Sequence, residues 1–96
     1  MYEIRYTETY LSWYNRLKDA NAIARIGLRL KRVEAGNFGD VKSVGGGISE
    51  MRIDYGPGYR IYFTVREKEI VFLLAGGDKR TQTADIKLAI ELAETV

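Results

Sequence analysis

The hydrophobic positions change their period near the middle of the chain. From residue 7 to about residue 36 apolar side chains recur every three to four residues, and from about residue 38 they alternate with polar ones. The first spacing is that of amphipathic helices, and the second is that of strands with one buried face. Residues 2–6 also alternate, which predicts an opening strand. The order strand, helices, strands predicts an α+β domain with a mostly antiparallel sheet.

Two amphipathic helices are predicted between the opening strand and Gly36. The first begins after Thr7 or Thr9, because either side chain can accept a backbone N–H at a helix N-terminus. The second begins after Asp19 and ends at Gly36, since glycine adopts the left-handed backbone of a helix end. The side chains expected to point inward are Tyr10, Trp13, Tyr14 and Leu17 in the first helix and Ile23, Ile26, Leu30 and Val33 in the second. Those expected to point largely outward are Arg25, Arg29, Lys31 and Arg32.

The rest of the chain predicts four more strands and a short last helix. The strands are expected over residues 38–44, 48–55, 59–65 and 70–75, with a charged turn at 66–69. The segment 70–75 is apolar on both faces, which is typical of an interior strand. Gly76 and Gly77 are expected to end it. The last helix is expected to begin after Thr81 or Thr83 and to point Ile86, Ala89, Ile90 and Ala93 inward.

The segment from Gly45 to Phe63 predicts a hairpin with one apolar and one charged face. A pairing of Tyr55 with Tyr59 across the turn would bring these apolar pairs together: Ile53 with Ile61 and Met51 with Phe63. The opposite face would then hold the pairs Arg52–Tyr62, Asp54–Arg60 and Glu50–Thr64. A pairing of Val65 with Ile70 would continue the apolar face with Phe63 opposite Phe72 and Ile61 opposite Leu74. With helices covering one face of the sheet, the charged face should be free to bind an anionic ligand.

The amino-acid composition limits the kinds of site that the protein can hold. The 96 residues make one domain, 1–96, and 46% hydrophobic with 29% charged residues is ordinary for a globular protein. The chain has no cysteine and no histidine, so we expect no disulfide, no zinc site, no other metal and no cofactor. No apolar run approaches the about 20 residues that span a bilayer, and the N-terminus lacks a signal-peptide layout. We therefore expect a cytoplasmic protein without a membrane partner.

Three motifs in the second half resemble those of a known toxin superfamily. They are Gly-Gly-Gly-Ile-Ser-Glu-Met-Arg-Ile (45–53), Gly-Pro-Gly-Tyr-Arg-Ile-Tyr-Phe (56–63) and Leu-Leu-Ala-Gly-Gly-Asp-Lys-Arg-Thr-Gln (73–82), followed by Asp85-Ile86. From Tyr6 to about Ala93 the chain resembles the RelE/ParE toxin superfamily, and most closely its HigB-like branch of addiction-module killer proteins. The resemblance implies a RelE-like fold and a toxin of a type II toxin–antitoxin system. It implies that the protein cleaves messenger RNA on the ribosome and so inhibits translation. It also implies a helix-turn-helix antitoxin, with operator DNA bound only through that antitoxin.

The resemblance also implies site residues. Arg52, Arg60 and Lys79 match the basic residues that hold and polarise the scissile phosphate in RNA-cleaving members. Asp85 stands where many of those members carry a tyrosine or histidine as general acid. Side-chain chemistry adds further candidates for catalysis: Glu50 or a lysine could act as general base, and Tyr62 could donate a proton or stack on a base. Candidates for RNA contacts are Arg80, Lys42 and Arg29.

RNA cleavage without histidine or metal is chemically reasonable. A ribose 2′-hydroxyl attacks the adjacent phosphorus, and preorganised cations stabilise the phosphorane. Arginine suits this task because its planar fork donates to two phosphate oxygens. Three alternatives remain open on the sequence alone. Arg52 and Arg60 could simply pair with Glu50 and Asp54, the protein could be a ParE-like inhibitor of DNA gyrase, or it could be an RNA-binding module without catalysis.

Overall fold

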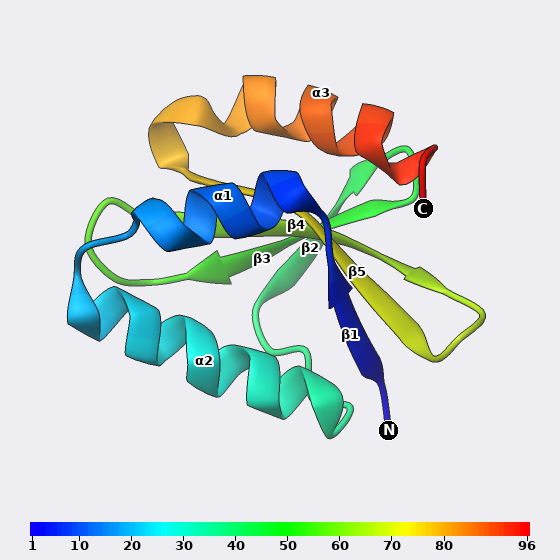
Figure 1. Cartoon of the computed structure of the whole chain (residues 1–96), viewed down its shortest axis with the longest axis horizontal. Helices are drawn as coiled ribbons and strands as arrows, with labels where there is room; N and C mark the ends of the chain where they lie inside the picture. Colours follow the sequence, from blue (N-terminus) through cyan, green and yellow to red (C-terminus); the bar gives the residue numbers. More distant parts are fainter.

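A five-stranded sheet with helices on both faces forms the protein (Figure 1), and the computed structural model describes residues 1–96. The elements in chain order are β1 (Glu3–Tyr6), α1 (Glu8–Arg16), α2 (Ala20–Glu34), β2 (Val41–Gly45), β3 (Ile48–Ile53), β4 (Tyr59–Arg66), β5 (Ile70–Asp78), the 3-10 turn η1 (Lys79–Thr81) and α3 (Gln82–Ala93). The strand order is β1-β5-β4-β3-β2, and only the β1–β5 pair is parallel. The predicted α+β class with a mostly antiparallel sheet is confirmed.

The predicted helix boundaries are confirmed at both caps of the helical hairpin. The Thr7 hydroxyl accepts the Tyr10 amide at 3.1 Å, and the Asp19 carboxylate accepts the amides of Asn21 and Ala22. Gly36 ends the second helix with a φ of +95°. These local contacts begin and end the helices where the hydrophobic pattern does.

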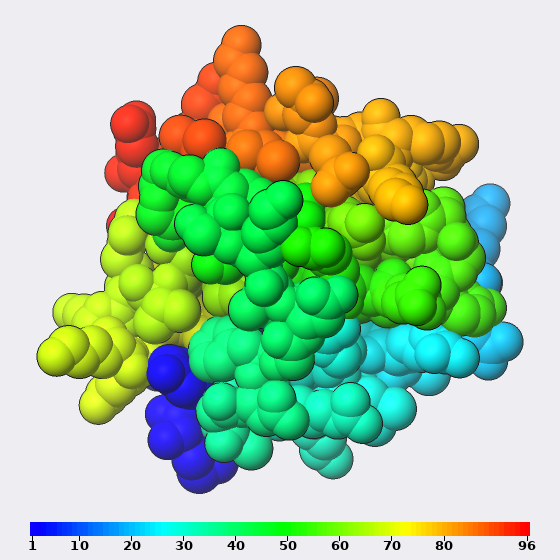
Figure 2. All heavy atoms as spheres, turned by 180° about the vertical axis from the view of Figure 1, so that it is seen from behind, coloured from blue at the N-terminus to red at the C-terminus, as the bar shows by residue number.

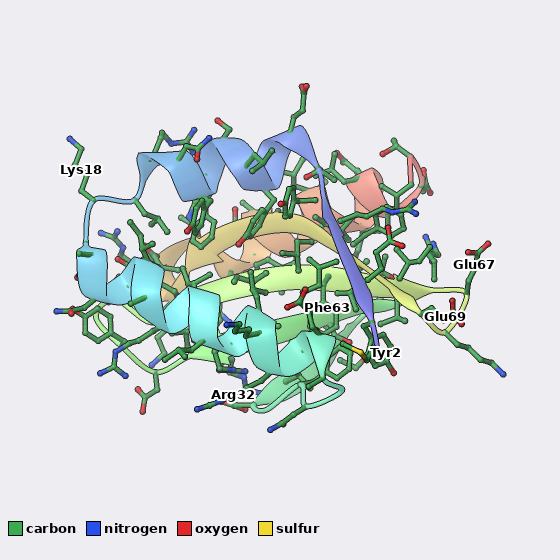
Figure 3. All side chains as sticks on the ribbon, turned by 60° about the horizontal axis from the view of Figure 1, so that its bottom comes forward. Tyr2, Lys18, Arg32, Phe63, Glu67 and Glu69 are labelled. Atoms are coloured by element: carbon green, nitrogen blue, oxygen red, sulfur yellow. The ribbon has the colours of Figure 1, made fainter.

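The first core lies between the sheet and the α1–α2 hairpin. Its buried members are Tyr10, Ile26, Val33, Met51, Ile53, Ile61, Phe63, Val71 and Leu73. Trp13, Tyr14, Leu17 and Leu30 pack around this cluster. The apolar faces predicted for both helices and for the hairpin strands therefore meet in one core, and Figure 3 shows Phe63 beneath the helical hairpin.

The second sheet face is not free, contrary to prediction. On this face α3 buries Ala89 and Ala93 against Ile48, Tyr62, Leu74 and Ala75. This second core exists because β5 carries apolar side chains on both faces, and both must be covered. Viewed from behind, α3 lies along one side of the molecule, and green residues of β2, β3 and the turn after β3 remain at the surface (Figure 2). Ile90, predicted to point inward, is 37% exposed and lies over Gly46.

Both predicted strand registers are wrong, with different consequences. In the β3–β4 pair Met51 faces Ile61 and Ile53 faces Tyr59, two residues away from the predicted pairing. Because side chains alternate with a period of two, this shift leaves every residue on its predicted face. In the β4–β5 pair Phe63 faces Leu73, next to a bulge. That one-residue change moves Phe72 to the opposite face, where it packs against the second core.

Gly76 and Gly77 were predicted to end the strand, but they lie within β5, which continues to Asp78. A Cβ on Gly76 would overlap the Trp13 ring, and one on Gly77 would overlap the Asp85 carboxylate. These glycines therefore allow α1 and α3 to approach the sheet closely, one from each side. Two strands differ from the predicted ranges 38–44 and 48–55, since β2 begins only at Val41 and β3 already ends at Ile53.

Candidate functional site

Two arginines lie side by side on the sheet face that carries α3. Arg52 of β3 and Arg60 of β4 are direct cross-strand partners, and Arg60 in turn faces Gly77 of β5. At this end of the sheet is a cavity of about 310 Å³. Its lining residues are Asp40, Arg52, Asp54, Gly56, Pro57, Gly58, Arg60 and Lys79. The turn after β3, the end of β3, the start of β4 and η1 thus bring three cations around one space.

Glu50 lies behind the two arginines and is 3% exposed. Its Oε2 accepts hydrogen bonds from the Tyr62 hydroxyl at 3.0 Å and from Gln82 Nε2 at 2.8 Å. Its Oε1 lies 3.5 Å from Arg52 Nε and 3.8 Å from Arg60 Nε. Glu50 is absent from the cavity lining, so it faces the arginines and not the open space.

The arginines keep hydrogen-bonding capacity that the protein does not use. The Nε atoms of Arg52 and Arg60 are both buried and have no hydrogen-bond partner. Buried polar groups are normally satisfied, and an unsatisfied one is costly. Two guanidinium groups face a single buried carboxylate, and Lys79, Asp40 and Asp54 also line the cavity. The guanidinium groups of Arg52 and Arg60 also line the cavity, where they can donate to an anion.

Tyr62 cannot act as predicted, because its side chain is 0% exposed. Burial and the adjacent Glu50 carboxylate raise the pKa of Tyr62 well above its usual range, so the phenol remains a hydrogen-bond donor to Glu50. A residue without exposed surface can neither stack on a base nor donate a proton to a bound ligand. Its cross-strand partner also differs from the prediction. Tyr62 faces Glu50 and not Arg52, and Arg52 faces Arg60.

Of the remaining predicted residues, Lys79 is brought to the cavity and the RNA-contact candidates are not. Arg80 is exposed and pairs with Asp78, with Nη2 and Oδ2 2.9 Å apart. Lys42 is exposed on β2, opposite Glu50. Their contacts with RNA remain predictions.

Arg29 does not point outward as predicted. Its guanidinium donates to the carbonyl oxygens of Arg52, Phe38 and Asp40, and burial lowers its pKa. Arg29 thus ties α2 to the strand that carries Arg52. Carbonyl acceptors carry no side-chain signal, which is why the outer face of the helix gave no indication of this role.

Two residues at the site, Gln82 and Asp40, were not predicted from the sequence. Gln82 is 32 residues from Glu50 along the chain, and only the docking of α3 brings them together. Asp85, also on α3, accepts a hydrogen bond from the Thr81 hydroxyl and lies over Gly77. Asp40 precedes β2, and no local pattern indicates that it lines the same cavity as Arg60.

No helix of the structure is both long and apolar enough to cross a membrane. The family model for phage-derived protein Gp49-like (DUF891) matches residues 13–96. A similar sequence is an uncharacterized protein of Haemophilus influenzae, 51% identical over 92 residues, which cover 96% of this chain and 93% of the relative.

Among solved structures, the chain is similar to one in the crystal structure of the intact E. coli RelBE toxin–antitoxin complex. The TM-score is 0.68 at 18% identity, over 81% of this chain and 96% of that chain. At this identity the likeness establishes the fold, and the predicted RelE-like fold is confirmed. The match over most of its length shows that the chain belongs to the family of phage-derived Gp49-like proteins.

Proposed function

We propose that this protein is the toxin of a type II toxin–antitoxin pair and that it cleaves messenger RNA on the ribosome. The observation that carries the proposal is the cavity in which the side chains of Arg52, Arg60 and Lys79 converge. These donors suit a phosphate diester, because guanidinium groups bind phosphate oxygens bidentately. The RelE-like fold and the sequence motifs around these three residues support the same assignment.

The proposed reaction uses the substrate's own 2′-hydroxyl. The 2′-oxygen attacks the adjacent phosphorus, and the bond from phosphorus to the 5′-oxygen breaks. The proton leaves the 2′-hydroxyl for a base, and the departing 5′-oxygen receives a proton. The products are a 2′,3′-cyclic phosphate and a 5′-hydroxyl. Arg52, Arg60 and Lys79 stabilise the charge that develops on the phosphorane oxygens.

Proton transfer is assigned to groups that line the cavity. Glu50 and Tyr62 are too deeply buried to reach a ribose or a leaving oxygen. The titratable groups of the lining besides the arginines are Asp40, Asp54 and Lys79. In the proposed mechanism an aspartate of this set accepts the 2′ proton, and the Lys79 ammonium supplies the proton to the 5′-oxygen.

The proposed partners are the ribosome with its messenger RNA and a cognate antitoxin. The structural neighbour is described as part of a toxin–antitoxin complex, and by analogy a co-encoded protein would neutralise this chain in the cytoplasm. The sequence resemblance to the HigB-like branch implies that this antitoxin is a small helix-turn-helix protein and that operator DNA is bound only through it.

Brief induction in a bacterial host tests the proposal. Growth should stop, and mapping of transcript 5′ ends should reveal discrete new ends within translated regions. Co-expression of the adjacent reading frame should restore growth. Normal growth of cells that contain soluble protein would refute the toxin assignment. Trapped gyrase–DNA complexes with uncut transcripts would refute the nuclease assignment and support a ParE-like inhibitor.

A further inference from the structure

Glu50 joins side chains from three elements, although it does not touch the cavity. Arg52 lies on its own strand β3, Arg60 and Tyr62 come from β4, and Gln82 comes from the first turn of α3. A carboxylate that is 3% exposed would be costly without partners, and these four side chains surround it.

The two oxygens of Glu50 have different kinds of partner. Oε2 accepts two hydrogen bonds from neutral groups, Tyr62 and Gln82, at 3.0 and 2.8 Å. Oε1 faces the two guanidinium Nε atoms at 3.5 and 3.8 Å, distances too long for ordinary N–H···O hydrogen bonds. The neutral donors therefore orient the carboxylate, while its second oxygen attracts the arginines without using their N–H donors.

We propose that Glu50, oriented by Tyr62 and Gln82, is a positioning residue that holds the guanidinium groups of Arg52 and Arg60 at the cavity, where they can bind a phosphate ester. The inference deepens the proposed function and rests on it for the identity of the ligand. The positioning itself is a property of the free protein and can be measured without RNA.

The charge of Glu50 is essential to this role. Arg52 and Arg60 are direct cross-strand partners, and like charges in that position repel. Low exposure strengthens the repulsion, because the surrounding dielectric is low. One carboxylate offsets one of the two charges, so the arginines can remain adjacent. A neutral side chain of the same shape would leave the pair repelling.

The test is Glu50→Gln in the full chain, which removes the charge and nearly preserves the shape. The matched control is Glu91→Gln, the same change on the exposed surface of α3. The first readout is the set of arginine Nε–Hε NMR signals, followed during titration with inorganic phosphate. In the wild type the Arg52 and Arg60 signals should be protected from water exchange and should shift on addition of phosphate. In Glu50→Gln both should exchange at least about tenfold faster, while the Arg29 signal and the control protein remain unchanged.

The second readout is ribosome-dependent cleavage. Misplaced arginines should lower kcat by about 10²-fold, whereas KM should stay constant or fall because the cavity has become more positive. A residue that only maintained the fold would lower the amount of active protein without this split. Tyr62→Phe removes one orienting hydroxyl and no packing volume, so it should give a smaller kcat loss at unchanged KM.

The outcomes separate the two proposals. Wild-type kcat and wild-type Nε–Hε protection in Glu50→Gln would overturn the positioning role, as would equal losses in Glu91→Gln. If Glu50→Gln fails to fold, Tyr62→Phe decides, and unchanged protection and kcat in that variant would overturn the role. If the wild type cleaves no RNA but the Nε–Hε signals respond as expected, the positioning role stands and the proposed reaction is wrong.

Discussion

Arg60 and Arg52 present the same chemical group to the cavity from different depths. The side chain of Arg60 is 10% exposed and that of Arg52 is 35% exposed. An interaction between charges is stronger where water is excluded, because the effective dielectric is lower. Arg60 is therefore expected to contribute more to transition-state stabilisation than Arg52.

Replacing Arg60 by alanine should abolish detectable cleavage and leave the fold intact. Loss of one preorganised donor costs about 10²- to 10³-fold in rate. Circular dichroism and transcript 5′-end mapping on the same protein measure the two effects. Arg60→Lys keeps the charge but loses the planar fork, so it should recover only part of the activity. Wild-type cleavage by well-folded Arg60→Ala would exclude this residue from the mechanism.

Gly76 offers a test of close approach at the residue scale. A Cβ there would overlap the Trp13 ring, so Gly76→Ala should destabilise the protein by about 1–3 kcal/mol. Gly27 is the matched control, since a Cβ on this exposed helical position meets nothing within 4 Å. Gly27→Ala should stabilise by about 0.5–1 kcal/mol. Urea unfolding measures both, and equal effects would show that the Trp13 contact is unimportant.

Among the elements, α1 is fixed to the sheet by its first cap. Thr7 both accepts the Tyr10 amide at 3.1 Å and donates from its hydroxyl to the Leu74 carbonyl of β5 at 2.6 Å. One side chain therefore starts the helix and attaches it to the strand. The helix in turn places Trp13 over Gly76.

Thr7→Ala should lower the free energy of unfolding by about 0.5–2 kcal/mol, because the helix loses its cap. Thr7→Ser retains the hydroxyl and both bonds, so it should stay close to the wild type. Chemical denaturation compares the three proteins. Similar losses in both variants would mean that the methyl group, and not the hydroxyl, is what matters.

For the molecule as a whole, the distribution of charge matters more than its sum. The net charge is only +2, yet three cations line one cavity, against two aspartates. Such local clustering attracts an anionic polymer even when the total charge is small. Salt dependence of binding should therefore report the cavity contacts.

Lys79→Ala should weaken binding of a short single-stranded RNA and reduce its salt dependence. Each phosphate contact contributes about 0.7 to the slope of log affinity against log salt for a single strand, so the slope should fall by about that amount. Lys87→Ala, an equal change at an exposed position on α3, is the control. An unchanged slope in Lys79→Ala, or an equal fall in the control, would remove Lys79 from the phosphate site.

The sequence by itself determined the local features of this protein. Thr7, Asp19 and Gly36 mark helix ends through contacts or backbone conformations within a few residues. The alternation around Arg52 and Arg60 placed both on the polar face, and the two-residue error in register could not change that. Periodicity and capping are local, so they can be read from neighbouring residues.

Only the tertiary structure decided what lies against these features. The depth of Glu50 and Tyr62 depends on α3, whose residue Gln82 is 32 positions away from Glu50. The glycines of β5 were predicted to break the strand. Their role is to allow the approach of Trp13 and Asp85 from distant helices, and no neighbouring residue indicates that role. The register at the β4–β5 turn, where Arg66 and not Val65 faces Ile70, decided which face Phe72 occupies. Register, close approach and burial arise when separate elements pack together, so no local pattern specifies them.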